Sequence, residues 1–281
     1  MPAPEPSLEI AAEGVTLSVQ DSGGSMPIVL LHGLTATRRY VVMGSRALER
    51  TGHRVIAYDA RGHGRSSPAP ERAYGYEHLA GDLLAVLDQL GLERAVLAGA
   101  SMGAHTVARV ALAQPERVAG LALITPSYEP GGPREEEELA RWDALAQGLR
   151  GGGVEGFVAA YELEGVPEAW RATIETVLRQ RLSAHEHLQA VAEALEVVPR
   201  SQPFEQIEEL AAIAVPTLVV ASRDEADPGH PLAVGERYAR AIAGAELLVE
   251  DAGPPPRSPI AWQGGQLSQA LAGLAARAYR P

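Results

Sequence analysis

Short apolar runs alternate with helical patterns along most of the chain. The runs lie at 27–31, 55–58, 95–98, 121–124 and 217–221, and each consists almost entirely of apolar residues. Runs of this kind predict strands of a parallel sheet that is covered on both faces. The segment Glu9–Gln20 alternates more regularly, which predicts a hairpin at the sheet edge. The predicted fold class is therefore α/β, with a doubly wound, mostly parallel sheet.

Helical patterns follow these runs. One has leucines at helical spacing, at positions 79, 83, 87 and 90, and Gly91 is the expected stop. The Ala-rich segment Met102–Gln114 predicts a second helix, which ends before Pro115. In a sheet of this type ligands bind beyond the carboxyl ends of the strands, so that edge is where chemistry is expected.

The alternation stops between Ile124 and Val215. This stretch holds only helical patterns, at 135–149, 154–161, 168–182 and 185–198. We therefore expect a helical cap over residues 128–205, inserted into an α/β core of residues 1–127 and 206–281.

Composition limits the possible partners. The 281 residues are long enough for one large α/β domain with an inserted lid. The net charge of −12 argues against nucleic acid and against an anionic membrane surface as partners. No apolar run approaches the roughly 18 residues that span a bilayer, and the N-terminus has no signal-peptide pattern. The absence of cysteine excludes disulfides and thiolate metal sites. The expected partner is a small-molecule substrate, and the expected location is the cytoplasm.

One motif carries chemistry. Gly99-Ala100-Ser101-Met102-Gly103 matches G-x-S-x-G and lies between a predicted strand and a predicted helix, as that motif requires. The turn is so tight that the two outer residues must be nearly free of side chain. The N–H of Met102, at a helix N-terminus, points to the space that Ser101 faces. A helix N-terminus favours anions, which suits the oxyanion of an acyl intermediate.

Two further segments extend this motif into a family pattern. His32-Gly33-Leu34 follows the first core strand, and the segment 59–66 follows the next. With these marks the sequence resembles the α/β-hydrolase superfamily, in its capped esterase-like and haloperoxidase-like branch, over roughly residues 10–125 and 205–280. The resemblance implies that the N–H groups of Leu34 and Met102 form the oxyanion hole.

The resemblance also implies a catalytic acid after the strand 217–221. Asp224 fits the family pattern G-x-x-D-x-x-x-P, with Ala221 at the glycine position and Pro228 in place. Its role would be to orient an imidazole and to stabilise its cation. Asp227 is a nearby alternative.

The general base departs from the family pattern, which places a Gly-His pair after the last strand. Here the last strand, 246–250, leads to Gly253-Pro254, and proline cannot accept a proton. A serine hydroxyl is a poor nucleophile without a base. His230, six positions after Asp224, is the favoured substitute. The alternatives left open are His185 and His187 in the cap, His32, and the absence of any histidine base.

The leading prediction is a cofactor-independent serine hydrolase that cleaves a carboxylic ester or a related acyl bond of a small, partly apolar substrate. Ser101, Asp224 and His230 would carry the catalysis. The residues expected to contact substrate are His32, Trp142 and Tyr161. No metal site is expected, because the closely spaced His185 and His187 point apart on a helix. The alternative, supported by Pro254, is a catalytically silent relative that binds a small ligand or partner.

Overall fold

The chain folds around one eight-stranded sheet in a computed structural model, which describes residues 7–130, 136–163, 165–223, 226–253 and 258–280. The strand order is β1-β2-β4-β3-β5-β6-β7-β8. β2 pairs antiparallel with both β1 and β4. The remaining neighbours in the sheet, β4-β3-β5-β6-β7-β8, pair parallel. The bounds are β1 Leu8–Ala12, β2 Val15–Asp21, β3 Ser25–Leu31, β4 His53–Tyr58, β5 Ala95–Ala100, β6 Val118–Ile124, β7 Thr217–Val220 and β8 Glu246–Leu248. The predicted fold class and the edge hairpin are confirmed.

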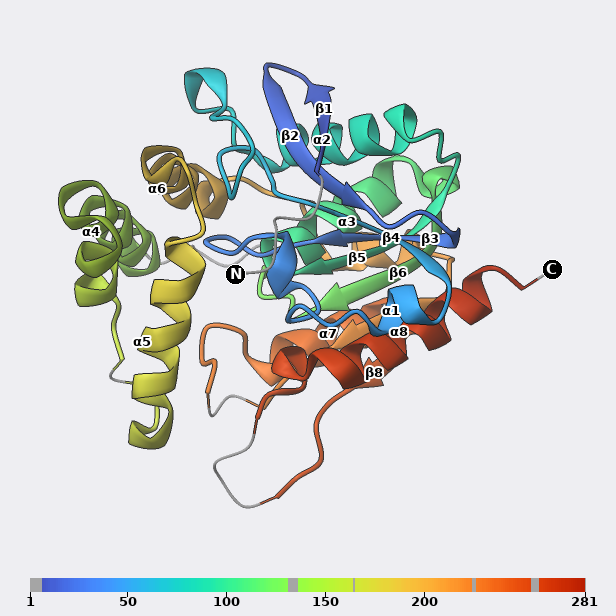
Figure 1. Cartoon of the computed structure of the whole chain (residues 1–281). Helices are drawn as coiled ribbons and strands as arrows, with labels where there is room; N and C mark the ends of the chain where they lie inside the picture. Colours follow the sequence, from blue (N-terminus) through green and yellow to red (C-terminus); the bar gives the residue numbers. More distant parts are fainter. Residues whose placement is uncertain (1–6, 131–135, 164, 224–225, 254–257, 281) are drawn as a thin grey trace.

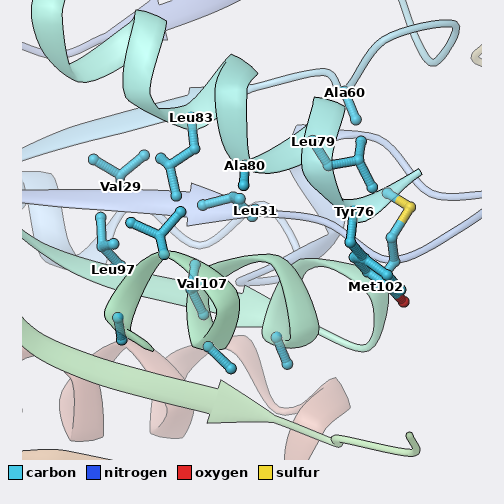
Figure 2. Packing of buried hydrophobic residues seen from close by; sticks show 14 of the residues in the cluster. Val29, Leu31, Ala60, Tyr76, Leu79, Ala80, Leu83, Leu97, Met102 and Val107 are labelled. Atoms are coloured by element: carbon cyan, nitrogen blue, oxygen red, sulfur yellow. The ribbon is translucent and has the colours of Figure 1, made fainter. Parts of the chain in front are cut away.

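Helices cover both faces of the sheet. Neighbouring strand residues point to opposite faces, so Val29 joins one apolar cluster and Leu30 the other. The first cluster, part of which is shown in Figure 2, joins the sheet to helices α2, α3 and α7. The second joins it to α1 and α8, which lie together in Figure 1. The bounds are α1 Ala47–Arg50, α2 Tyr76–Gln89, α3 Met102–Ala113, α7 Leu232–Ala241 and α8 Gly264–Ala278.

Three α-helices of the described residues lie between β6 and β7. They are α4 Glu136–Ala160, α5 Glu168–Leu182 and α6 Leu188–Val197. They pack around an apolar cluster of their own and lie to one side of the sheet (Figure 1). We refer to residues 136–200 as the helical insertion. Short 3-10 helices complete the structure: η1 Arg38–Tyr40, η2 Pro70–Arg72, η3 Pro115–Arg117, η4 Val198–Arg200, η5 Ile207–Ala212 and η6 Ile260–Trp262.

The insertion largely follows the sequence pattern. α5 has the predicted bounds, whereas α4 spans the two helices predicted at 135–149 and 154–161. Its two halves meet at a kink at Gly153, whose φ of 58° is in the left-handed region that favours glycine. The halves pack closely, because a Cβ added at Gly148 would overlap the backbone of Gly156. None of the helices in the described ranges is long and apolar enough to span a bilayer.

A buried ion pair supports the loop after β4. The side chains of Arg61 and Asp82 are each 1% exposed, and two nitrogens of Arg61 lie 2.7 Å from the two carboxylate oxygens. Arg61 also donates to the carbonyl of Ala73, at 2.7 Å. Since Asp82 belongs to α2, this pair fixes the loop to a helix of the core.

Replacing Asp82 by alanine is expected to lower the free energy of unfolding by about 3–5 kcal/mol, because it leaves the buried Arg61 cation unpaired. Urea denaturation measures this loss. Asp88→Ala is the matched control on the same helix, since Asp88 is exposed where it pairs with Arg117, and there we expect a loss of less than about 1 kcal/mol. Equal losses in the two variants would contradict the prediction.

Candidate active site

Ser101 occupies a strained turn between β5 and α3. Its φ of 51° and ψ of −113° place it outside the regions that non-glycine residues ordinarily occupy. The glycines of the motif make the turn possible. A Cβ at Gly99 would overlap the carbonyl of Gly103, and one at Gly103 would overlap the carbonyl of Leu31. The turn is anchored from below, because the buried Met102 side chain lies with Leu79 in the cluster of Figure 2.

His230 and Asp227 complete a hydrogen-bonded chain at Ser101. His230 Nε2 lies 2.9 Å from Ser101 Oγ, and His230 Nδ1 lies 2.8 Å from Asp227 Oδ1. An ionised carboxylate only accepts hydrogen bonds, so the proton of the neutral imidazole is on Nδ1. Nε2 is then an acceptor and receives the hydrogen bond of the Ser101 hydroxyl. This is the order of groups that activates a serine nucleophile.

A tight turn brings Asp227 and His230 together. The segment Asp227-Pro228-Gly229-His230 follows β7, and the N–H of His230 donates to the carbonyl of Asp227 at 3.1 Å. Proline at the second position of such a turn presets its backbone. The two side chains are each 23% exposed, so the pair is largely screened from water. Asp224, the acid predicted from the family pattern, lies outside the described residues, and the carboxylate at His230 is that of Asp227.

The charges around His230 favour a base of this kind. Burial lowers the pKa of the His230 imidazole, and the adjacent Asp227 carboxylate raises it by more, so the pKa lies above its ordinary value of 6.5. Burial raises the pKa of Asp227, but the charge of His230, its hydrogen bond and the Arg181 guanidinium hold that pKa below its ordinary value. Asp227 therefore stays ionised beside a histidine that binds a proton readily.

Two backbone N–H groups are available at the nucleophile. A Cβ at Gly33 would lie 3.3 Å from the Cβ of Ser101, so the loop after β3 runs directly against the serine. Leu34 follows Gly33, and its N–H has no hydrogen-bond partner among the described residues. Met102 is the first residue of α3, where N–H groups lack an intrahelical acceptor. Both residues predicted for an oxyanion hole thus carry N–H groups that could bind an anion.

The other histidines considered as bases make different contacts. His32 is 2% exposed, donates from Nδ1 to the carbonyl of Gly33 and accepts the N–H of Ala60 at Nε2. Both ring nitrogens are occupied, so His32 supports the loop through its two hydrogen bonds. His185 contacts Gly64 and Thr35, as described below. Among the described residues, His230 is the only histidine whose side chain hydrogen-bonds the Ser101 hydroxyl.

The two aromatic residues predicted to contact substrate differ in position. Trp142 and Tyr161 both pack against the apolar cluster of the insertion. Burial and the negative charge of Asp227 both raise the pKa of the Tyr161 hydroxyl, which is therefore within the electrostatic influence of the site. Trp262, from the core, joins the same cluster and contacts Trp170 edge to face, with ring centroids 5.7 Å apart. Sequence reasoning missed Trp262, since nothing local to η6 indicates this long-range contact.

The buried histidines predict acid sensitivity. Burial lowers the pKa of His32 to about 4 and holds those of His63 and His185 below their ordinary value. Between pH 6.5 and about 4 the unfolded chain binds protons that the folded chain cannot. Stability is therefore complete above about pH 6.5 and is lost as the pH falls to about 4, by on the order of 3 kcal/mol for His32 alone.

Urea denaturation at about pH 7 and about pH 4.5 measures this loss. The pKa of His230 is raised, so its contribution to stability grows as the pH falls. This single group opposes the loss caused by the three buried histidines. Carboxylates with lowered pKa values, such as that of Glu196 at about 2, lose their contribution mainly below the ordinary carboxyl pKa of 4.5. A free energy of unfolding that does not change over this interval would contradict the burial of three neutral imidazoles.

Comparison with known proteins identifies the family of the chain. Residues 26–160 match the family model described as the alpha/beta hydrolase fold. The chain is 32% identical over 234 residues to 2-hydroxy-6-oxononadienedioate/2-hydroxy-6-oxononatrienedioate hydrolase 2 of Pseudomonas putida, covering 80% of each chain.

Two solved structures extend the similarity to nearly the whole chain. One is the enol-lactonase of Burkholderia xenovorans LB400, with a TM-score of 0.76 and 25% identity, over 95% of this chain and 99% of the other. The other is a thermophilic esterase of Thermogutta terrifontis, with a TM-score of 0.77 and 27% identity, over 98% and 100%. These relatives are hydrolases, and they support a hydrolytic function. The chain belongs to the α/β-hydrolase fold family.

Proposed function

We propose that the protein is a serine hydrolase that cleaves a carboxylic ester or a related acyl bond. The observation that carries the proposal is the 2.9 Å hydrogen bond between Ser101 Oγ and His230 Nε2, with Asp227 on the far side of the ring. A serine in a strained turn is suited to nucleophilic catalysis when it is hydrogen-bonded to a histidine that is itself hydrogen-bonded to a carboxylate. The hydrolase, lactonase and esterase names of the relatives support the same class of reaction.

The reaction follows from these contacts. Ser101 Oγ attacks the substrate carbonyl while His230 Nε2 takes its proton, and Asp227 stabilises the imidazolium that forms. The N–H groups of Leu34 and Met102 bind the oxyanion of the tetrahedral intermediate. His230 then protonates the leaving alcohol, which departs and leaves an acyl-serine. A water molecule, deprotonated by His230, releases the acid and regenerates Ser101.

The helical insertion acts in this proposal as a cap over the site. Tyr161 of the insertion lies within the electrostatic influence of Asp227, and Leu34 packs against the apolar cluster of the insertion. A pocket bounded by such residues favours a small, partly apolar acyl or alcohol group. The alternative prediction, a catalytically silent relative, depended on Pro254, which lies outside the described residues. In the present proposal His230 supplies the base from another loop.

Hydrolysis of p-nitrophenyl acetate, butyrate and octanoate tests the proposal, with Ser101→Ala as the control. We expect the wild-type protein to hydrolyse the short esters faster than the octanoate, because the insertion packs against the loop beside Ser101. A wild-type rate that equals that of Ser101→Ala on all three esters, and on a small lactone, would contradict the proposal.

A further inference from the structure

The loop Gly33–Thr35 has a backbone that needs support. It carries the N–H of Leu34 that the proposed function assigns to the oxyanion hole. Thr35 has a φ of 69°, in the left-handed region that β-branched residues rarely occupy, and its exposed fraction is only 6%. A conformation of this kind is strained and persists only where surrounding contacts impose it. The loop must therefore be held by contacts with its surroundings.

Three consecutive carbonyl groups of the loop are each held by a donor. The carbonyl of Gly33 accepts hydrogen bonds from His32 Nδ1 at 2.8 Å and from the N–H of Ala36 at 3.0 Å. The carbonyl of Leu34 accepts from Arg181 Nη2 at 3.2 Å. The carbonyl of the next residue, Thr35, accepts from an imidazole at 3.0 Å. With these carbonyls fixed, the peptide planes cannot rotate freely, and the Leu34 N–H keeps its direction.

Two of these donors come from the C-terminal end of α5 in the helical insertion. Arg181 is in the last turn of the helix, and its Nη2 also lies 3.3 Å from Thr35 Oγ1. His185 follows the helix and donates from Nε2 to the Thr35 carbonyl. Its Nδ1 accepts the N–H of Gly64 at 2.7 Å, which fixes the proton on Nε2. One imidazole therefore joins the loop after β3 to the loop after β4.

The attachment of this end of the insertion to the core is reinforced. The N–H of Glu186 donates to the carbonyl of Gly64 at 2.9 Å, next to the bond made by His185. The ring of His185 is 8% exposed and packs edge to face on His63, with ring centroids 5.5 Å apart. Burial lowers the pKa of His185, so the imidazole stays neutral and keeps both bonds near neutral pH. The end of α5 is thus attached to the core at Gly64, and from there its side chains hold the loop Gly33–Thr35.

We infer that Arg181 and His185 are positioning residues, which hold the Gly33–Thr35 loop so that the Leu34 N–H faces the oxyanion. The inference rests on the proposed function for its catalytic consequence. Neither side chain hydrogen-bonds Ser101 or His230 among the described residues. His185 therefore acts through the loop, whereas the charge of Arg181 also helps to keep Asp227 ionised. The oxyanion hole then forms only when the helical insertion packs against the core.

The test compares His185→Leu with His185→Gln, whose amide can both accept from Gly64 and donate to Thr35. On p-nitrophenyl butyrate we expect His185→Leu to lower kcat by about 10- to 100-fold, part of the loss caused by removing an oxyanion-hole donor. KM should change by less than about threefold, because ground-state binding is not altered. His185→Gln should recover most of kcat. Arg181→Gln removes the other side-chain hydrogen bonds from the insertion to the loop. If His185→Leu does not fold, hydrogen exchange in Arg181→Gln provides the test, because its kcat also reports the lost charge near Asp227.

Arg179→Gln is the matched control. Arg179 lies on the same helix, but within the described part of the chain its side chain pairs with Glu155 and Glu175 of the insertion and not with the loop. Hydrogen exchange of the peptide that covers residues 33–42 gives a readout that does not depend on activity. We expect faster exchange there in His185→Leu and Arg181→Gln, and no change in Arg179→Gln. Exchange and kcat equal to those of the control would overturn the inference. A wild-type protein inactive on every ester would refute the proposed function alone, since the exchange result still decides whether the loop is held.

Discussion

Ser101→Ala and His230→Ala are each expected to lower kcat for ester hydrolysis by about six orders of magnitude, and the double variant by no more than either one. The reason is that the two groups act as a unit. Without the hydroxyl there is no acyl-serine, and without the imidazole the hydroxyl keeps its proton and attacks slowly. The hydrogen bond between Ser101 Oγ and His230 Nε2 shows that the two side chains are already in contact in the absence of substrate. Steady-state kinetics on p-nitrophenyl butyrate measures the three losses.

The double variant His185→Ala/His187→Ala is the informative control for that experiment. Both residues were alternatives for the base when only the sequence was considered. His185 bonds Gly64 and Thr35 instead. If His185→Ala/His187→Ala abolished turnover while His230→Ala stayed active, the assignment of the base would be wrong.

Asp227→Asn is expected to lower kcat by about four orders of magnitude, because an asparagine amide can stabilise the wrong imidazole tautomer and carries no charge to balance the imidazolium. The pH profile changes as well. In the wild-type protein kcat/KM should fall as the pH drops through the pKa of His230, which Asp227 holds above 6.5. Without that carboxylate, burial and the Arg181 charge both lower the pKa of His230, so the acid limb should move to lower pH.

Asp224→Asn provides the comparison with the family pattern. We expect it to retain kcat within about tenfold of wild type, because the carboxylate that bonds His230 is that of Asp227. Kinetics of both variants between about pH 5 and pH 9 decides between them. A large loss in Asp224→Asn with a near-normal Asp227→Asn would transfer the role of the acid to Asp224.

Local rules predicted the elements and the tight turn at Ser101 well. The motif around Ser101 needs its glycines for steric reasons that hold at any such turn, and the structure shows the overlap that a side chain would cause. The bounds of α5 follow from Pro167 before the helix and from helix-favouring residues within it. These features depend on contacts between near neighbours in the chain, which a single sequence displays directly.

The acid and the supports of the loop depend on other information. Asp224 was favoured by a family spacing, although Asp227-Pro228-Gly229-His230 carries its own turn signal, which brings both side chains to the same place. Asp227 was the alternative acid in the sequence-based prediction, and this turn signal supports it. The contacts of His185 with Gly64 and Thr35 join residues more than 100 positions apart, and no local pattern predicts them.

The most direct test of an activated Ser101 is labelling by a fluorophosphonate probe, with the modified residue mapped by mass spectrometry, in wild type, Ser101→Ala and His230→Ala. We predict labelling of the wild-type protein at Ser101, none at that position in Ser101→Ala, and a rate in His230→Ala lower by at least about a thousandfold. A folded wild-type protein that does not react, or a His230→Ala variant that reacts at the wild-type rate, would contradict a nucleophile activated by His230.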